Sequence, residues 1–294
     1  MPQRELSIGL AQRTPLHGPN VLTDLRTDVE RTLALHPDLD MLVYPELHLQ
    51  GVDHLPDEEQ PAALAQLAVP LDDPFVLMIG EVAAEFGIWL CPGSIGESTC
   101  TEKQYNTQLL FSPDGTLIAS YRKMFPWRPF EPHRPGADFV VSPIDGHGVL
   151  GLSNCYDAWF PEHSRHLAWM GADAIINIVK TTSQDRDQEL VLARANAIVN
   201  QVYMLSVNCA EPVGRGHSIA VDPEGHVLAE AGAGEDTLVV RVDSGHIQRV
   251  RARGTAGTNR IWSQFAPDDE PISLPLYDGN IEPKRWSPHY RGHD

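Results

Sequence analysis

Apolar residues along the first third of the chain follow two spacings in turn. Short apolar runs at residues 6–11, 41–44 and 88–95 predict strands. Between these runs, apolar residues recur three and four positions apart, which predicts amphipathic helices over residues 22–33 and 75–86. This order of strand and helix is typical of an α/β layer architecture.

The rest of the pattern adds hairpins and repeats the order of strand and helix. Residues 112–115 and 222–225 each place Pro and Gly between two strand-like runs, which predicts two β-hairpins. Residues 174–209 predict an apolar strand, a long helix marked by apolar residues at helical spacing, and a second strand. Residues 237–242 predict a last strand. Hairpins combined with strand–helix units predict mixed sheets.

The chain divides into a domain and an extension. No Ser/Gly-rich, charged or low-complexity linker interrupts residues 1–250, so they are predicted to form one domain. Residues 251–294 are rich in proline and have no apolar periodicity. Large apolar side chains are costly to leave in water, so we expect this extension to pack on the domain or on a partner subunit. Its large apolar residues are Trp262, Phe265, Leu274, Tyr277, Trp286 and Tyr290.

The balance of charge narrows the classes of partner. Forty acidic residues stand against 22 basic ones, which gives a formal net charge of -18, and Lys and Arg form no cluster. Nucleic acid and anionic membranes are therefore not expected as partners, and a small neutral substrate fits better.

The sequence shows no pattern typical of export or membrane insertion. The first residues lack an apolar signal region, and no apolar run approaches the roughly 18 residues that a membrane span requires. The four cysteines form no CxxC pair and are too sparse for a disulfide scaffold, which suits a reducing compartment. We therefore expect a soluble cytoplasmic protein.

Residues 148–162 place a cysteine at a predicted corner between a strand and a helix. The segment GVLGLSNCYDAWFPE begins as a buried strand, turns near Cys155 and enters a helix at Pro161. A side chain at such a corner projects over the sheet edge, close to unpaired N–H groups of the helix start. A nucleophile suits this position, and so does an inert buried thiol, which is the commoner fate of cysteine.

Two charged residues also have a functional and a structural interpretation. Glu46 follows the predicted strand 41–44, and α/β folds tend to hold their chemistry at such strand ends. Lys123 opens the segment 122–132, whose prolines predict an irregular loop of the kind that lines sites. In isolation, Glu46 also fits a helix-capping carboxylate, and Lys123 also fits a solvated loop charge.

Three segments resemble, in the same order, the three motifs of the nitrilase (carbon-nitrogen hydrolase) superfamily. They are YPELHLQG at residues 44–51, YRKMFPW at 121–127 and LSNCYDAWFPE at 152–162. The resemblance covers about residues 5–245 and implies an α/β fold with mixed sheets, a four-layer α-β-β-α sandwich. In that family two such domains pair through helices near the nucleophile. The resemblance therefore implies a homodimer or a multiple of dimers, in which the C-terminal extension reaches across to the partner subunit.

The resemblance also implies roles for individual residues. Carried over by motif, Cys155 is the nucleophile, Glu46 the general base and Lys123 the electrostatic stabiliser. A second glutamate of the family corresponds to Glu131, eight residues after Lys123, a spacing that resembles the aliphatic amidase and formamidase branch. Glu131 is expected to hold the amide N–H₂ of the substrate and to stay hydrogen-bonded to Lys123. These residue types make sense independently, because a thiol with an ordinary pKa needs a base and a nearby cation. Two carboxylates near one ammonium should keep the lysine charged and leave one glutamate with a raised pKa.

Hydrolysis of a small neutral amide through a cysteine thioester is the function that this set predicts. The backbone N–H of Tyr156 would hold the oxyanion together with Lys123, and Trp127, Phe130 and Trp159 would form an apolar pocket for the acyl group. No metal or organic cofactor is implied, because the thiol, the carboxylates and the lysine complete the chemistry. Alternatives on the same fold are an N-carbamoyl amide hydrolase, a nitrilase and an inactive scaffold or regulatory subunit.

Five further residues are given structural roles or depart from the family pattern. His163 and His166 form an HxxH pair without a third ligand, so both are predicted to lie on a helix surface. Asp157 is predicted to be structural, and Cys209 to lie in the core. His48 stands where the family pattern leads us to expect another residue.

Overall fold

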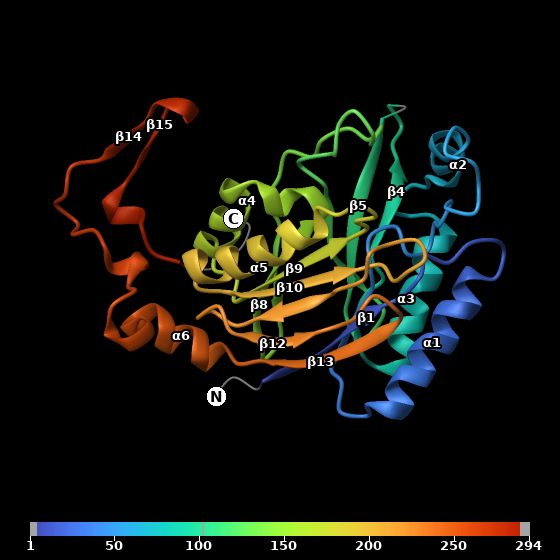
Figure 1. Cartoon of the computed structure of the whole chain (residues 1–294), viewed down its shortest axis with the longest axis horizontal. Helices are drawn as coiled ribbons and strands as arrows, with labels where there is room; N and C mark the ends of the chain where they lie inside the picture. Colours follow the sequence, from blue (N-terminus) through green and yellow to red (C-terminus); the bar gives the residue numbers. More distant parts are fainter. Residues whose placement is uncertain (1–4, 102, 289–294) are drawn as a thin grey trace.

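Most of the strands form two mixed sheets that pack face to face (Figure 1). This computed structural model describes residues 5–101 and 103–288. Tyr290, one of the apolar residues of the extension, lies outside the described residues. The strand order in each sheet decides which loops meet at its edge.

The first sheet brings together strands from both ends of the chain. Its seven strands are β1 (Leu6–Gln12), β2 (Met41–Val43), β3 (Trp89–Cys91), β4 (Ser94–Ser98), β5 (Gln104–Phe111), β6 (Leu117–Arg122) and β13 (Asp236–Val242). They follow the order β13-β1-β2-β3-β5-β4, and β6 pairs with β5 outside that path. β1 is parallel to β2 and antiparallel to β13, so a late strand of the chain completes one edge.

The second sheet is built from the second half of the chain. Its six strands are β7 (Val141–Ile144), β8 (Gly148–Asn154), β9 (Ala174–Val179), β10 (Tyr203–Asn208), β11 (Ile219–Val221) and β12 (Val227–Glu230). They follow the order β12-β11-β10-β9-β8-β7, and β8, β9 and β10 are parallel neighbours. The carboxyl ends of these three strands therefore lie side by side.

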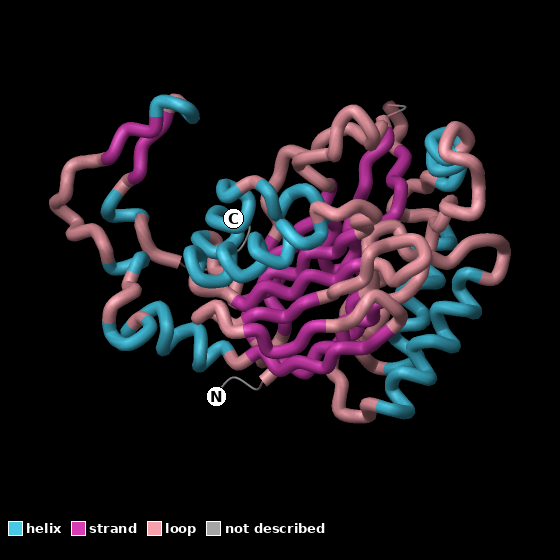
Figure 2. Tube along the Cα trace, viewed as in Figure 1, coloured by secondary structure: helices cyan, strands magenta, loops and turns pink. Residues whose placement is uncertain are grey.

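Helices cover the outer face of each sheet (Figure 2). The helices are α1 (Val21–Leu35), α2 (Gln60–Leu67), α3 (Pro74–Phe86), α4 (Pro161–Trp169), α5 (Arg186–Asn200) and α6 (Ser244–Arg253). Of these, α6 lies beside the sheets (Figure 1), with Ile247 in the apolar cluster between them. Helices α1 and α3 pack against each other beside the first sheet, and α4 and α5 pair in the same way beside the second. α3 has clear boundaries, because the Asp73 side chain accepts from the Phe75 N–H at its start and Gly87 ends it at a φ of 64°.

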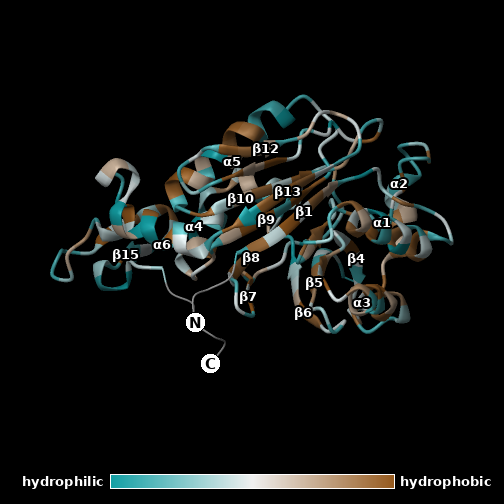
Figure 3. Ribbon diagram, turned by 90° about the horizontal axis from the view of Figure 1, so that it is seen from below, coloured by the Kyte–Doolittle hydropathy of each residue, from teal (hydrophilic) through white to brown (hydrophobic). Residues whose placement is uncertain are grey.

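Three apolar clusters of described residues separate the layers. Figure 3 shows that many residues of the strands are hydrophobic. The middle cluster joins the two sheets, with Ile8 and Val43 from the first and Leu152 and Ile176 from the second. The outer clusters lie beneath the two helix pairs. The order helix, sheet, sheet, helix confirms the predicted four-layer α-β-β-α sandwich.

The predicted strand over residues 88–95 is two strands. β3 ends at Cys91 and β4 begins at Ser94, because Pro92 lacks an N–H for the ladder and Gly93 has a φ of 96°. A Cβ on Gly93 would lie 1.9 Å from the carbonyl oxygen of Pro45. The break therefore lets the β3–β4 corner approach the segment that carries Glu46.

The extension leaves α6 and packs on the second helix pair through its tryptophans. Trp262 is buried, and its indole N–H donates to the carbonyl of Asn200 at the end of α5. Trp286 lies 5.3 Å from Trp262 between ring centroids. Between them, the hairpin of β14 (Ile272–Leu274) and β15 (Gly279–Ile281) projects beyond the body of the molecule (Figure 1). Leu276 at its tip is 84% exposed.

Membrane insertion was not expected from the sequence. Within the described residues, the helices all lack the combination of length and apolarity that crossing a bilayer demands.

Candidate active site

The predicted base, cation and nucleophile follow three strands whose ends converge. Glu46 lies in the turn after β2, Lys123 follows β6, and Cys155 follows β8. Glu46 and Lys123 are buried, and Cys155 is partly exposed. Charged groups buried in this way must be paired with one another or satisfied by hydrogen bonds.

Cys155 occupies a strained corner. Its φ of 51° lies in the left-handed region, which a residue other than glycine rarely adopts. The strand β8 ends directly before it, and a short 3₁₀ helix over Cys155–Trp159 leads into α4. This arrangement confirms the predicted strand-to-helix corner.

Lys123 lies between the two glutamates. Its Nζ donates to Oε1 of Glu46 at 3.0 Å and to Oε2 of Glu131 at 2.6 Å. The side-chain amide of Asn106 on β5 also donates to both carboxylates, at 2.7 Å to Glu46 and 2.9 Å to Glu131. Asn154, the residue before the cysteine, donates to the amide oxygen of Asn106 at 2.9 Å. One hydrogen-bonded network thus ties both glutamates to the strand that carries Cys155.

Glu131 has a donor for each of its acceptor positions. Oε2 accepts from Lys123 and, at 3.0 Å, from the backbone N–H of Trp127. Oε1 accepts from Asn106 and faces Nδ1 of His133 at 3.1 Å. A carboxylate has about four lone-pair positions, so these donors use the hydrogen-bonding capacity of Glu131.

The electrostatics of the three groups follow from their burial and pairing. Burial raises the pKa of Cys155 well above its ordinary value, Glu46 raises it further, and Lys123 opposes the change. Burial alone would lower the pKa of Lys123, but Glu46, Cys155 and Glu131 raise it well above its usual range. Lys123 is therefore a permanent cation, as predicted, and the resting sulfur is a thiol.

The pKa of Glu131 moves in the opposite direction. Burial would raise it, but Lys123 and the hydrogen bonds from His133 and Asn106 bring it far below the usual range for a carboxyl. Glu131 is therefore ionised, and it is not the glutamate with a raised pKa that two neighbouring carboxylates suggested.

Asp157 is buried and structural, in line with the prediction. It accepts hydrogen bonds from the Tyr121 hydroxyl at 2.7 Å and from the backbone N–H groups of Asn154 and Phe125, both at 2.9 Å. The prediction for His163 was wrong. His163 is fully buried, and its Nε2 lies 2.8 Å from the Tyr121 hydroxyl, because α4 turns this side chain toward the sheet.

The predicted pocket aromatics fall into two groups. Trp127 and Phe130 pack on each other with ring centroids 4.4 Å apart, and both are exposed, by 40% and 66%. Tyr156 and Trp159 lie within the 3₁₀ helix after the cysteine, with ring centroids 5.9 Å apart. Both groups belong to loops that adjoin Lys123 or Cys155 in sequence.

Sequence reasoning missed Asn106, Asn154 and His133. Asn106 stands in a run of polar residues on β5, and only the fold shows that its side chain points at the glutamates. Asn154 directly precedes Cys155 in the cysteine motif, and this position was the one signal in the sequence that could have indicated a role in the site. Cys209, predicted to be a core residue, is buried just after β10.

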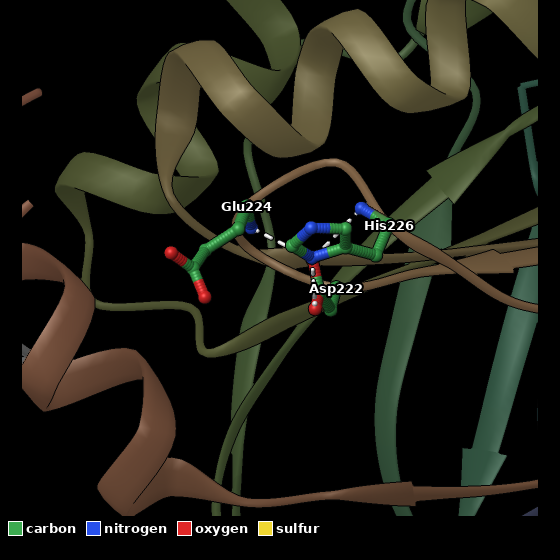
Figure 4. A group of neighbouring side chains, drawn as sticks. All are labelled: Asp222, Glu224 and His226. Carbon is green, nitrogen blue, oxygen red and sulfur yellow. Dashed lines mark hydrogen bonds and ion pairs between the residues drawn. The ribbon is translucent and has the colours of Figure 1, made fainter. Parts of the chain in front are cut away.

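A second group of ionisable residues lies in the turn between β11 and β12 (Figure 4). Asp222, Glu224 and His226 bring potential metal-ligand atoms within 4.8 Å of one another. Asp222 already accepts from the backbone N–H groups of Glu224 and His226, and it faces Nδ1 of His226 at 3.0 Å. Glu224 faces Nε2 of His246 on α6 at 3.2 Å. These contacts account for the cluster as the structure of a hairpin turn.

The chain matches one protein family over most of its length. The family described as carbon-nitrogen hydrolase matches residues 19–252, a range that contains Glu46, Lys123, Glu131 and Cys155. The formamidase of Pseudomonas syringae pv. tomato is 29% identical over 245 residues, which cover 79% of this chain and 70% of that protein. The formamidase of Nitratidesulfovibrio vulgaris is 30% identical over 220 residues, which cover 71% of this chain and 64% of that protein.

Solved structures with the same fold include two kinds of protein. A Saccharomyces cerevisiae member of branch 10 of the nitrilase superfamily superposes with a TM-score of 0.75 at 28% identity, covering 85% of this chain and 94% of that one. A cysteine-to-alanine mutant of the amidase from Nesterenkonia sp. AN1, solved in complex with butyramide, has a TM-score of 0.67 at 26% identity, with coverages of 84% and 94%. In another structure of that amidase, the acetamide moiety of fluoroacetamide is covalently added at the active-site cysteine.

Proposed function

The chain belongs to the carbon-nitrogen hydrolase family, and we propose that it hydrolyses a small neutral amide to an acid and ammonia through a thioester on Cys155. The family match and the formamidase and amidase relatives make it a carbon-nitrogen hydrolase that acts on amides. The observation that carries the finer proposal is the position of Lys123 between Glu46 and Glu131, in the network that reaches the Cys155 strand.

The first half of the proposed reaction forms the thioester. Glu46 accepts the thiol proton as the sulfur of Cys155 attacks the amide carbon, because the raised pKa leaves the resting sulfur protonated. The carbonyl oxygen becomes an oxyanion, which Lys123 and the backbone N–H of Tyr156 stabilise. Each donor aimed at that oxygen contributes on the order of 3 kcal/mol. Glu46 then gives its proton to the nitrogen, and the carbon–nitrogen bond breaks to release ammonia.

The second half returns the enzyme to its starting state. Glu46 accepts a proton from a water molecule as the water oxygen attacks the thioester carbon. The same two donors hold the second oxyanion. The carbon–sulfur bond breaks, the acid leaves, and the sulfur of Cys155 regains its proton from Glu46.

We propose that Glu131 positions Lys123, in place of the expected hold on the amide N–H₂ of the substrate. Its acceptor positions are used by protein donors, and one of these is the Nζ of Lys123. It therefore fixes the direction of the ammonium group and keeps that group charged, while Glu46 remains the carboxylate available to move protons.

A small neutral amide is the substrate class that fits best. The net charge of -18 opposes the approach of an anion. The relatives named formamidase and the butyramide complex of the Nesterenkonia amidase support an amide with a short acyl group.

Ammonia release and intact-protein mass spectrometry test the proposal. The panel contains formamide, short aliphatic amides, nitriles and N-carbamoyl compounds, and the variants are Cys155→Ala, Glu46→Gln and Lys123→Ala. We expect ammonia from simple amides and an acyl adduct on the native chain, and we expect each variant to lose at least about a hundredfold in kcat/KM.

Three results would contradict the proposal. An active Cys155→Ala enzyme would remove the thioester, and turnover confined to nitriles or N-carbamoyl compounds would change the substrate class. The absence of both turnover and adduct would favour an inactive scaffold. The exposed Lys103→Met is the control for loss of a single positive charge.

A further inference from the structure

A second ion pair has its cation directly after the strand that neighbours the nucleophile's own strand. β8 and β9 are parallel and in register, with Asn154 opposite Ile178. Cys155 is the first residue after β8, and Lys180 is the first residue after β9. The backbone N–H of Lys180 hydrogen-bonds the sulfur of Cys155, where it helps to lower the thiol pKa against the effect of burial.

The side chain of Lys180 pairs with a residue from the other sheet. Its Nζ lies 2.8 Å from the carboxylate of Asp53, in the loop that follows Glu46. The two side chains remain accessible, with exposed fractions of 13% and 20%. Both charges also act on the buried thiol of Cys209, whose pKa burial raises to about 12. The pair therefore lies among the ends of β2, β9 and β10, and the residue that carries its cation also contacts the sulfur of Cys155 through its backbone N–H.

This ion pair has hydrogen-bonding capacity to spare. An ammonium group has three N–H donors, and among the described residues Asp53 is the recorded hydrogen-bond partner of the Lys180 side chain. A carboxylate with about four lone-pair positions likewise has room for more donors than one ammonium supplies. A partly exposed pair contributes little to stability, so tying the two loops together is a weak reason for these two charges.

The charges of the pair favour a ligand that carries both signs. A lone carboxylate on the substrate would be attracted by Lys180 but repelled by Asp53, and the net charge of -18 would oppose its approach. A lone ammonium group on the substrate would be attracted by Asp53 but repelled by Lys180. A dipolar group with no net charge can place its carboxylate on Lys180 and its ammonium on Asp53, so that opposite charges alternate.

We propose that Lys180 and Asp53 form a subsite for the far end of the acyl chain, and that the substrate is a primary amide whose far end carries both a carboxylate and an ammonium group. The inference rests on the proposed function, because it places the amide carbon at Cys155. The chemistry is unchanged: the carbon–nitrogen bond is hydrolysed, and the dipolar end takes no part in bond making.

Four amides of similar length separate the two charges. Glutamine carries both groups, glutaramic acid carries the carboxylate alone, 4-aminobutanamide carries the ammonium alone, and pentanamide carries neither. We expect kcat/KM for glutamine, or for its shorter homologue asparagine, to exceed the values for the other three amides by about tenfold or more. We expect Lys180→Met and Asp53→Asn each to reduce the ratio of the dipolar amide to pentanamide by about tenfold. Lys103→Met should leave that ratio unchanged.

Direct binding separates this inference from the proposed function. Calorimetry of glutamine and asparagine with the Cys155→Ala protein measures the subsite without turnover, and Lys180→Met in that background should weaken binding about tenfold. Thermal unfolding of each variant checks that the fold persists. If simple amides are hydrolysed with no preference for a dipolar end, the subsite is overturned and the amidase stands. If the dipolar amide binds through Lys180 but no amide is hydrolysed, the proposed function fails and the subsite stands.

Discussion

The hydroxyl of Tyr121 donates a hydrogen bond to the carboxylate of Asp157 at 2.7 Å, and this contact joins the two segments that carry the proposed chemistry. Tyr121 lies two residues before Lys123, and Asp157 lies two residues after Cys155. Asp157 also accepts from the N–H of Phe125, so it holds the lysine loop from both sides of Lys123. The relative position of cation and nucleophile therefore depends on one buried carboxylate.

Removing the Tyr121 hydroxyl should impair both catalysis and stability. We expect Tyr121→Phe to lower kcat about tenfold with little change in KM, because small displacements of Lys123 from the oxyanion cost several-fold in rate. The lost hydrogen bond to a charged group should destabilise the fold by about 2 kcal/mol. Steady-state kinetics and urea unfolding measure the two effects.

Tyr203→Phe is the matched control for that prediction. Tyr203 is also buried, and its hydroxyl also contacts a histidine, His246, at 3.1 Å, so the variant loses a similar contact. Tyr203 lies in β10, away from the lysine loop. It should lower stability and leave kcat close to that of the native chain. Equal losses of kcat in the two variants would show that Tyr121 has no positioning role.

Replacing Glu131 should produce a stability loss that disappears in acid. The folded pKa of Glu131 lies below the unfolded value of about 4.3, because Lys123 outweighs the effect of burial. Above the unfolded pKa the ionised carboxylate stabilises the fold, and this contribution is lost as the pH falls toward the folded pKa. At neutral pH, Glu131→Gln should cost on the order of 3 kcal/mol.

Urea unfolding of both proteins between about pH 7 and pH 3 measures this difference. The gap between native chain and Glu131→Gln should narrow as the pH falls below about 4.3. A gap that stays constant over that range would mean that the charge of Glu131 contributes nothing to stability. Activity of the variant should also fall, because Lys123 loses one of the two groups that direct it.

The fold and the three central residues could be predicted because each has a local signal. Cys155, Glu46 and Lys123 lie in contiguous motifs at strand ends, and apolar spacing alone located the main helices and strands. His163 had a misleading signal, because polar His163 and Ser164 occupy the buried face of α4 where apolar residues are expected. The break at Pro92 and Gly93 was hidden within an apolar run.

Long-range partners could not be predicted in the same way. Asn106 stands 60 residues from Glu46 and 25 from Glu131, and nothing in its neighbourhood along the chain differs from any polar stretch of a strand. The Lys180–Asp53 pair spans 127 residues. Such contacts depend on strand order, which brings the ends of β2, β5 and β9 together only once both sheets have formed.

Trp262 should hold the extension on the domain. It is buried against the end of α5 and close to Trp286, so Trp262→Ala leaves a large cavity and should cost about 3–5 kcal/mol. Limited proteolysis should then cut the chain after α6 sooner than in the native protein. Leu276→Ala, at the exposed tip of the projecting hairpin, is the control, and equal protease sensitivity of the two variants would contradict this role for Trp262.

His48 should make the fold sensitive to mild acid. Its ring is 1% exposed and stacks on Tyr44 with centroids 4.8 Å apart, and neither ring nitrogen has a hydrogen-bond partner among the described residues. Burial lowers its pKa to about 3, while the unfolded value is about 6.5. Between these values the unfolded chain binds a proton that the folded chain does not, so the free energy of unfolding falls as the pH falls.

His48→Phe should remove that dependence, because a phenyl ring keeps the stacking and cannot take up a proton. At about pH 8 His48 is uncharged in both the folded and the unfolded chain. The difference in free energy of unfolding between variant and native chain then reports packing alone. At about pH 4 the free energy of unfolding of the variant, relative to that of the native chain, should be higher than at pH 8 by on the order of 3 kcal/mol. Urea unfolding at both values tests this, and a difference that is the same at pH 8 and pH 4 would show that His48 takes up its proton in the folded chain as readily as in the unfolded one.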